Sequence, residues 1–244
     1  MRGAPCYRGV VGAVLTGQLL HVSPSAAAIP EQVVPAYPEI GAPTFTSPGG
    51  SGTSSSGTSG TATSFDGAWG TSDAYETMMA QTYGADAVAA AQAAGINPDT
   101  LAAFGQIESH FQNVGNGSSS ADGVWQVTDA TWNQYASQLG LSDADRSDPA
   151  TQAKVASAII SDYASAVSSA TGGTATGAQV YGAYMFGTKA GSAIATETDA
   201  ATPLSTFVSA KALAANNMTG WTVGQYETAI SSRMGSGATE AAIS

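Results

Sequence analysis

The sequence NPDTLAAFGQIESHF, residues 97–111, is the segment around which the chain is organised. Asn97 followed by Pro98 predicts a helix start, because asparagine caps the first turn and proline lacks an N–H that this position leaves unpaired. On a helical wheel, Glu108 shares an apolar face that covers about a third of the circumference, as in a core-facing helix. The other members of that face are Leu101, Phe104, Ile107 and Phe111.

A carboxylate pushed toward apolar surroundings resists ionisation, so we expect the pKa of Glu108 to be raised. A glutamic acid that keeps its proton near neutral pH can act as a general acid. The same position also fits a Glu108 that reaches water at the edge of the stripe, or one that a buried partner binds. Other features of the sequence are needed to separate these interpretations.

Composition limits the possible partners. The chain has 244 residues, 43% of them apolar and 10% charged, which suits one sizeable domain with extensions. Abundant Ala, Ser, Thr and Gly favour small-residue helix packing in an exported protein. The net charge is −11 and no basic stripe could neutralise phosphates. We therefore expect no nucleic acid partner and no electrostatic docking to a membrane.

Residues 1–28 are typical of a secretory signal peptide. They have a basic start, an apolar run too short for a comfortable membrane span, and small residues that end at Ala28. We expect cleavage near Ala28, a periplasmic or extracellular location, and no membrane attachment afterwards; the alternative is an uncleaved anchor. Cleavage would remove Cys6, so the mature chain would hold no disulfide and no thiolate site.

Residues 29–64 are rich in Pro, Gly, Ser and Thr and predict a disordered linker, because such a segment cannot bury a core. Only helical patterns follow, without a convincing alternating strand, so the predicted fold class is all-α. The folded domain is expected over residues 65–234, with a flexible tail at 235–244. Within this domain, capping and stop signals predict further helices over 73–83, 85–95, 128–140, 149–172 and 180–187, and helix starts at 202–203 and 222.

The sequence gives little indication of a metal-binding or cofactor-binding site. His21 lies in the predicted signal peptide, which leaves His110 as an isolated metal ligand. The segment DADRSDP, residues 143–149, begins like a calcium loop but lacks its glycine and terminal glutamate. We therefore expect no metal and no cofactor. A serine triad is also disfavoured, because His110 lies on a different helix face from Glu108.

Once metal, cofactor and serine-triad chemistry are disfavoured, catalysis by a carboxylate is the remaining possibility. A two-carboxylate glycosidase needs a second acid, and the candidates are Asp122 and Asp129, the first acids that follow Glu108 in sequence. Asp122 lies in a polar loop, and Asp129 fits the first turn of a helix, where it favours the macrodipole. Each is therefore better explained as structural. A single acid suffices where the substrate supplies its own nucleophile, as an N-acetyl sugar does through its acetamido oxygen.

Short blocks of sequence carry a resemblance to a known family. They are Glu108-Ser109-His110-Phe111, then SSSADGVWQVTDATW from residue 118, DPATQAKVASAI from residue 148, and YGAYMFG at 181–187. In this order they resemble the soluble lytic transglycosylase (SLT) domain of the goose-lysozyme-like superfamily. They are most similar to variants in phage tail and bacterial cell-wall proteins. The resemblance covers about residues 94–194 and continues more faintly through 212–234.

This resemblance implies a lysozyme-like helical fold and an activity on peptidoglycan. The family cleaves the glycan strand between N-acetylmuramic acid (MurNAc) and N-acetylglucosamine (GlcNAc) without water, which leaves a 1,6-anhydro end. Glu108 matches its single catalytic acid/base. The resemblance assigns substrate contacts to Gln126 and Tyr184, and to Ser109 a part in holding the substrate or the glutamate. It assigns an apolar wall to Trp125, where the family usually has Met or Phe. Peptidoglycan strands are thus the expected partner, and no protein partner is indicated.

Two alternatives stay open. The first is a hydrolytic muramidase, in which water replaces the sugar 6-hydroxyl as the final nucleophile. The second is a wall-binding module that kept the fold and lost turnover. Met185 is the only support for the second, because it stands where many family members have asparagine.

Overall fold

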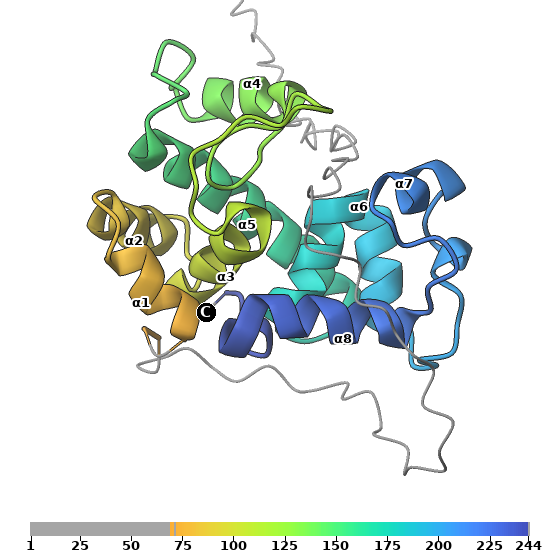
Figure 1. Ribbon diagram of the computed structural model, residues 1–244. Helices are drawn as coiled ribbons and strands as arrows, with labels where there is room; N and C mark the ends of the chain where they lie inside the picture. The colour runs from red at the N-terminus through yellow and green to blue at the C-terminus, as the bar shows by residue number, and fades with distance from the viewer. Residues whose placement is uncertain (1–68, 71, 244) are drawn as a thin grey trace, which may run out of the picture.

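The computed structural model describes residues 69, 70 and 72–243, which are helical and contain no strand (Figure 1). The all-α prediction is confirmed for this part of the chain. Its α-helices are α1 Asp73–Met79, α2 Gly84–Ala93, α3 Pro98–Ser109, α4 Asp129–Gln138, α5 Pro149–Thr171, α6 Gly177–Thr196, α7 Ala210–Ala215 and α8 Val223–Met234; the 3-10 helices are η1 Leu204–Thr206 and η2 Gly235–Ala238. The predictions for residues 1–28 and 29–64 lie outside the described residues.

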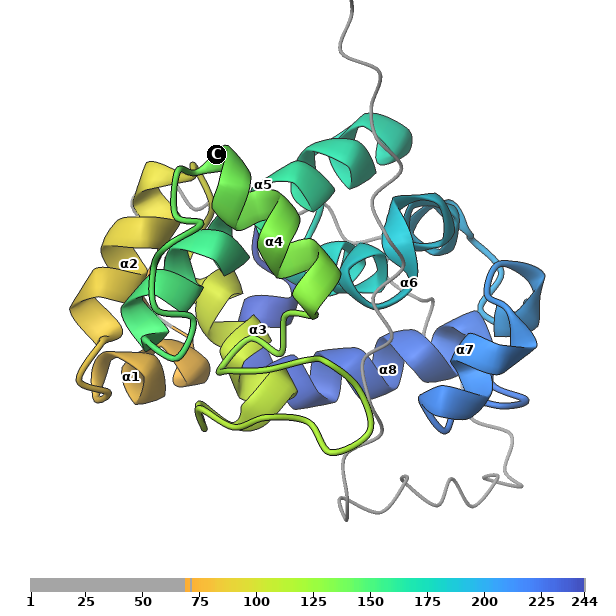
Figure 2. The same cartoon turned by 90° about the horizontal axis from the view of Figure 1, so that it is seen from above.

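Helix α3 lies at the centre of the fold. In Figure 1, α1 and α2 lie to one side of it and α6 and α7 to the other, while α8 crosses below, and Figure 2 gives the view from above. It packs against α1, α2, α5, α6 and α8. All of its twelve residues except Gln106 are buried. The helix is therefore enclosed on every side rather than along one stripe, so its polar side chains need partners within the protein.

Both ends of α3 are fixed by local backbone chemistry. The Asn97 side chain accepts a hydrogen bond from the Asp99 N–H at 3.0 Å, and Pro98 occupies the first helical position, as predicted. At the other end His110 and Phe111 adopt left-handed conformations, with φ of 52° and 62°. Two such residues in succession cannot continue an α-helix, so the chain turns away directly after Ser109.

Other predicted helix starts are also observed. Asp148 caps α5 by accepting from the Ala150 and Thr151 N–H groups at 3.2 and 3.1 Å. Thr222 and Gln225 form the capping box of α8. Thr128 precedes α4 as expected, but its hydroxyl lies 3.1 Å from the Thr131 hydroxyl and caps no N–H.

Three predicted boundaries are corrected by the structure. The helix expected over 73–83 ends at Met79, and only the 3-10 turn of η1 follows the start predicted at 202–203. The helix expected to end at Gly187 only kinks there, where φ is 81°, and then continues to Thr196. The second half of α6 folds back so closely that a side chain at Gly191 would lie 2.2 Å from the Ala183 nitrogen.

The flexible tail predicted for residues 235–244 is also corrected, because residues 235–243 pack onto the core. The Asn97 N–H donates to the Ala242 carbonyl at 2.9 Å, and the Ala242 N–H donates to the Ala175 carbonyl at 2.9 Å. Ala238 and Ala242 are buried. This tail therefore ties the start of α3 to the start of α6, which its small, weakly patterned residues do not reveal in the sequence.

Polar residues gather where this tail meets the start of α3. Asp99 is fully buried and accepts from the Gly70 and Ser72 N–H groups at 2.5 and 3.1 Å. The Glu240 carboxylate accepts from the Asn97 amide at 3.0 Å. Burial, and next the negative charge of Asp99, raise the pKa of Glu240 to about 7. The folded protein therefore favours a protonated Glu240.

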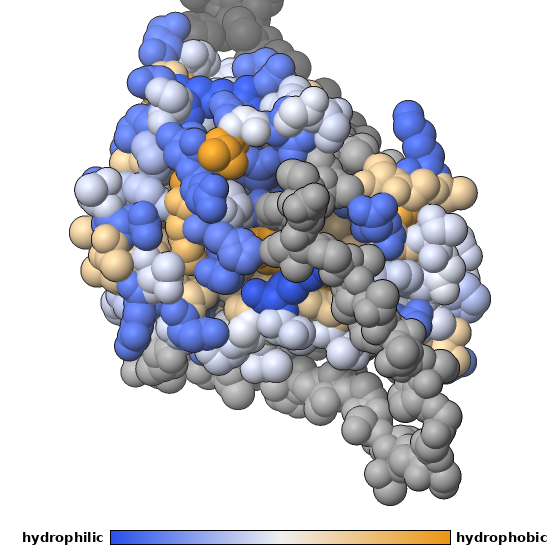
Figure 3. Space-filling view, viewed as in Figure 1, coloured by the Kyte–Doolittle hydropathy of each residue, from blue (hydrophilic) through white to orange (hydrophobic). Residues whose placement is uncertain are grey.

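The surface mixes hydrophilic and apolar residues, as the face in Figure 3 shows. Large apolar side chains with substantial exposure are separate in the sequence: Trp69, Met79, Val114 and Leu139. None of the described helices has the length and hydropathy that crossing a membrane would require.

We predict that Glu240→Gln weakens the pH dependence of stability. A carboxyl whose pKa is about 7 in the folded protein and about 4.5 in the unfolded chain stabilises the protein fully below pH 4.5 and loses this contribution as pH rises through 7. The melting temperature of the wild type should therefore fall between pH 5 and pH 8, and fall less in the variant. Thermal unfolding followed by circular dichroism measures this, with the exposed Glu76→Gln as the charge-matched control. Equal slopes in all three proteins would contradict the prediction.

Candidate active site

Glu108 lies in the last turn of α3 and has no exposed surface. Its Oε1 accepts a hydrogen bond from the Tyr181 hydroxyl at 2.9 Å, whereas Oε2 has no partner among the described residues. Burial raises the pKa of Glu108 to about 8, and the Tyr181 hydrogen bond opposes this shift. Glu108 thus holds a proton at neutral pH and keeps one oxygen free of protein partners, as a general acid requires.

Tyr181 is the residue near Glu108 that the sequence interpretation missed. It belongs to the YGAYMFG block, three residues before Tyr184, so both tyrosines lie on the same face of α6. Their rings stack with centroids 6.2 Å apart. The spacing of the two tyrosines was the available signal, but it could not show which hydroxyl reaches Glu108.

An aromatic cluster encloses the carboxyl group. Phe104 lies one helical turn before Glu108, and its ring makes edge contacts with Tyr181 and Tyr184 at centroid distances of 5.2 and 5.0 Å. All three rings are buried. Because they replace water with apolar surface, they produce the desolvation that raises the pKa of Glu108.

The segment after α3 folds over its end and is held by the residues that were predicted to contact substrate. The Ser109 hydroxyl donates to the Val124 carbonyl at 2.7 Å. Gln126, whose φ is 46°, donates from Nε2 to the Val114 and Gly123 carbonyls, both at 2.8 Å. Both side chains are therefore used within the protein, where they shape the loop beside Glu108.

Trp125 and Tyr184 are core residues in this structure. Neither has exposed surface. The indole N–H of Trp125 donates to the Leu101 carbonyl at 2.9 Å, and the Tyr184 hydroxyl donates to the Trp125 carbonyl at 2.6 Å. Both rings support the loop from inside, and their contact with a substrate stays a prediction. The pattern GVWQ could not separate a core tryptophan from a ligand-facing one.

Gln152 anchors the same loop from α5. Its Oε1 accepts from the Val124 N–H at 2.9 Å, and its Nε2 donates to the Asn113 side chain at 2.9 Å and to the Arg146 carbonyl at 2.8 Å. Gly123 makes room for it, because a Cβ there would lie 2.4 Å from the Gln152 amide carbon. Gln152 thus binds the N–H of Val124, and Ser109 binds its carbonyl. The sequence contained Gln152 in the DPATQAKVASAI block without showing this role.

The other titratable residues near this segment have structural partners. Asp129 forms an ion pair with Arg146, and Asp122 accepts from the Gly123 N–H at 2.9 Å. His110 is exposed at the end of α3. None of these side chains is bonded to Glu108. In the part of the chain that the structure describes, no group of His, Cys, Asp and Glu is arranged to hold a metal ion.

Comparison with known protein families gives a match. The family model described as the transglycosylase SLT domain matches residues 87–202, which include Glu108, the loop after α3, Gln152 and Tyr181. No curated protein matches the chain significantly. The matched segment starts in α2 and runs past α6, so it holds all the contacts to Glu108 described above.

We predict that Tyr181→Phe raises the pKa of Glu108 further. The tyrosine hydroxyl stabilises the charged carboxylate, so its removal favours the protonated form. A ¹³C NMR titration of the glutamate carboxyl signals, with the Glu108 signal assigned from a Glu108→Gln spectrum, measures the change. Tyr184→Phe is the matched control, because its hydroxyl bonds to a backbone carbonyl. A Glu108 pKa that is unchanged or lowered in Tyr181→Phe would refute this.

We also predict that Gln152→Leu lowers the free energy of unfolding by about 2–4 kcal/mol, because three hydrogen bonds are lost and the Val124 N–H is left buried and unpaired. The hydrogen-exchange rates of the backbone amides of residues 112–127 should also be higher in the variant. Urea unfolding and hydrogen exchange provide the measurements. The exposed Gln92→Leu on α2 is the control. The anchoring role would be excluded if both variants were as stable as the wild type.

Proposed function

Residues 87–202 are a transglycosylase SLT domain of the lysozyme-like superfamily, and we propose that this domain is a peptidoglycan lytic transglycosylase with Glu108 as its single acid/base. Domains of this family act on the glycan of the bacterial cell wall. The single observation that carries the proposal is Glu108 itself, which is fully buried, protonated at neutral pH and unpartnered at Oε2. Glycosidic cleavage starts with a proton donor of this kind.

The proposed reaction uses the Glu108 carboxyl group twice, first as an acid and then as a base. Glu108 donates its proton to the glycosidic oxygen while the acetamido oxygen of MurNAc attacks the anomeric carbon and displaces the leaving sugar. The resulting carboxylate then takes the proton of the MurNAc 6-hydroxyl, whose oxygen attacks the anomeric carbon and releases the acetamido oxygen. The 1,6-anhydro product forms and Glu108 is protonated again. The Tyr181 hydroxyl stabilises the carboxylate between the two steps.

The absence of a bonded carboxylate partner supports the use of the substrate's own nucleophile. Asp122 and Asp129, the first acids that follow Glu108 in sequence, are bonded to Gly123 and Arg146. A retaining glycosidase would need a second carboxylate about 5 Å from the first. We therefore propose substrate assistance. Ser109 and Gln126 are proposed to shape the loop at the substrate site through the backbone bonds that they make.

The proposal includes export, because peptidoglycan lies outside the cytoplasm. It rests on the basic, apolar and small-residue order of residues 1–28. Residues 29–64 would then act as a linker before the catalytic domain.

We predict that Glu108→Gln lowers the release of anhydro-muropeptides from purified peptidoglycan by about 100-fold or more, because the amide cannot donate the proton that cleavage needs. Mass spectrometry of the products measures this and separates the alternatives. A muramidase yields reducing ends that are one water heavier than anhydro ends. A wall-binding module yields no product from the wild type and binds glycan in both proteins. Unchanged release of anhydro ends by Glu108→Gln would reject the proposal.

A further inference from the structure

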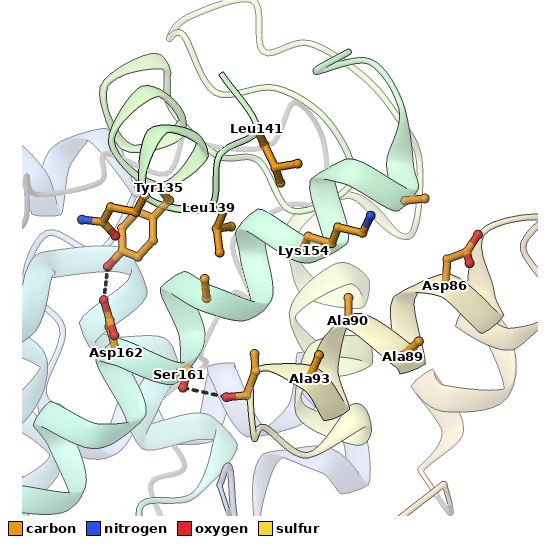
Figure 4. Close-up of a pocket in the computed structure, with 14 residues that line it drawn as sticks. Asp86, Ala89, Ala90, Ala93, Tyr135, Leu139, Leu141, Lys154, Ser161 and Asp162 are labelled. Carbon is orange, nitrogen blue, oxygen red and sulfur yellow. Dashed lines mark hydrogen bonds between the residues drawn. The ribbon is translucent and has the colours of Figure 1, made fainter. Parts of the chain in front are cut away.

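A cavity lies between α2, α4 and α5. Among the described residues, none that lines this cavity is hydrogen-bonded to Glu108. Its volume is about 660 Å³, within the range of small-ligand sites. Figure 4 shows Tyr135, Leu139 and Leu141 on one side and the alanines of α2 on the other. The cavity is thus a separate feature of the fold.

The walls of this cavity are mostly methyl groups. The lining includes Ala89, Ala90 and Ala93 of α2 and Ala150 and Ala158 of α5. Such walls accept small aliphatic groups and leave no broad aromatic face for stacking a sugar ring. Tyr135 is the only aromatic residue in the lining, and its hydroxyl donates to Asp162 at 2.9 Å.

Charged groups of both signs lie within the same cavity. Lys154 is exposed and forms no ion pair with a described residue, although its charge helps to lower the pKa of Asp148. Figure 4 places Lys154 between the leucines and the α2 alanines, with Asp86 near one end and Asp162 near the other. A ligand complementary to this arrangement carries a carboxylate for Lys154, an ammonium or amide N–H for the aspartates, and methyl groups between them.

We infer that this cavity binds the peptide stem of peptidoglycan. The inference rests on the proposed function, since the stems are attached to the MurNAc residues of the strand that the domain would cleave. A stem offers alanine methyl groups, free carboxylates and the ammonium of its diamino acid, which are the groups that the cavity matches. A neutral glycan would use neither Lys154 nor Asp86. The domain would then hold its substrate at two places, the glycan near Glu108 and a stem between α2, α4 and α5.

The free tetrapeptide L-Ala-γ-D-Glu-meso-diaminopimelate-D-Ala tests the inference without any turnover. Titrated into the ¹⁵N-labelled full chain, it should shift amide signals of α2, α4 and α5. Lys154→Gln should weaken binding about twofold to fivefold, the range of a partly exposed ion pair. Ala93→Phe, which fills the cavity, should weaken it about tenfold or more. Trialanine, which lacks the side-chain charges, should bind more weakly than the tetrapeptide.

Matched controls keep the test specific. Lys211→Gln removes a lysine from α7, and Ala85→Phe adds a ring to an exposed position of α2 outside the cavity, so both should bind as the wild type does. Circular dichroism checks that all variants fold. The inference is overturned if the tetrapeptide does not bind, if its shifts centre on Glu108 and Tyr181, or if Lys154→Gln and Ala93→Phe bind like their controls. Because the peptide contains no sugar, these results are independent of whether the domain cleaves peptidoglycan.

Discussion

The burial of all of α3 except Gln106 is the constraint on which the rest of the structure depends. A helix that is enclosed on all sides leaves no water for its polar side chains, so each must be bonded within the protein or stay uncharged. Asp99 near its start meets the first condition through two backbone N–H groups. Glu108 at its end meets the second, because burial raises its pKa to about 8. The same enclosure that stabilises the fold therefore produces the acid that the proposed reaction needs.

The surroundings of Glu108 balance two opposing demands. Phe104 and the stacked tyrosines exclude water, which favours the protonated carboxyl group. The Tyr181 hydroxyl favours the carboxylate, which must exist for part of the proposed cycle. An acid/base that gives one proton to the leaving sugar and later takes another from the 6-hydroxyl needs both forms within reach near neutral pH. Both effects depend on the positions of the α6 tyrosine rings, which Phe104 of α3 fixes by packing against them.

The loop that follows α3 is held by hydrogen bonds to both backbone groups of one residue, Val124. Ser109, next to Glu108, binds the Val124 carbonyl, and Gln152 of α5 binds the Val124 N–H. Gly123 permits the close approach of Gln152. A chain segment without helix or strand is thereby held as firmly as a regular element, and it lies directly beside the acid.

Local signals in the sequence determined the helical class, the starts of α3, α5 and α8, and the place of Glu108 on a buried helix face, because capping and periodicity act over a few neighbouring residues. The tertiary structure alone decided the partner of Glu108, which is 73 residues away in the chain. It also placed Trp125 in the core and packed the end of the chain against α3. Such contacts depend on how distant elements pack. A short motif has the same sequence whether its side chains face a ligand or the protein interior.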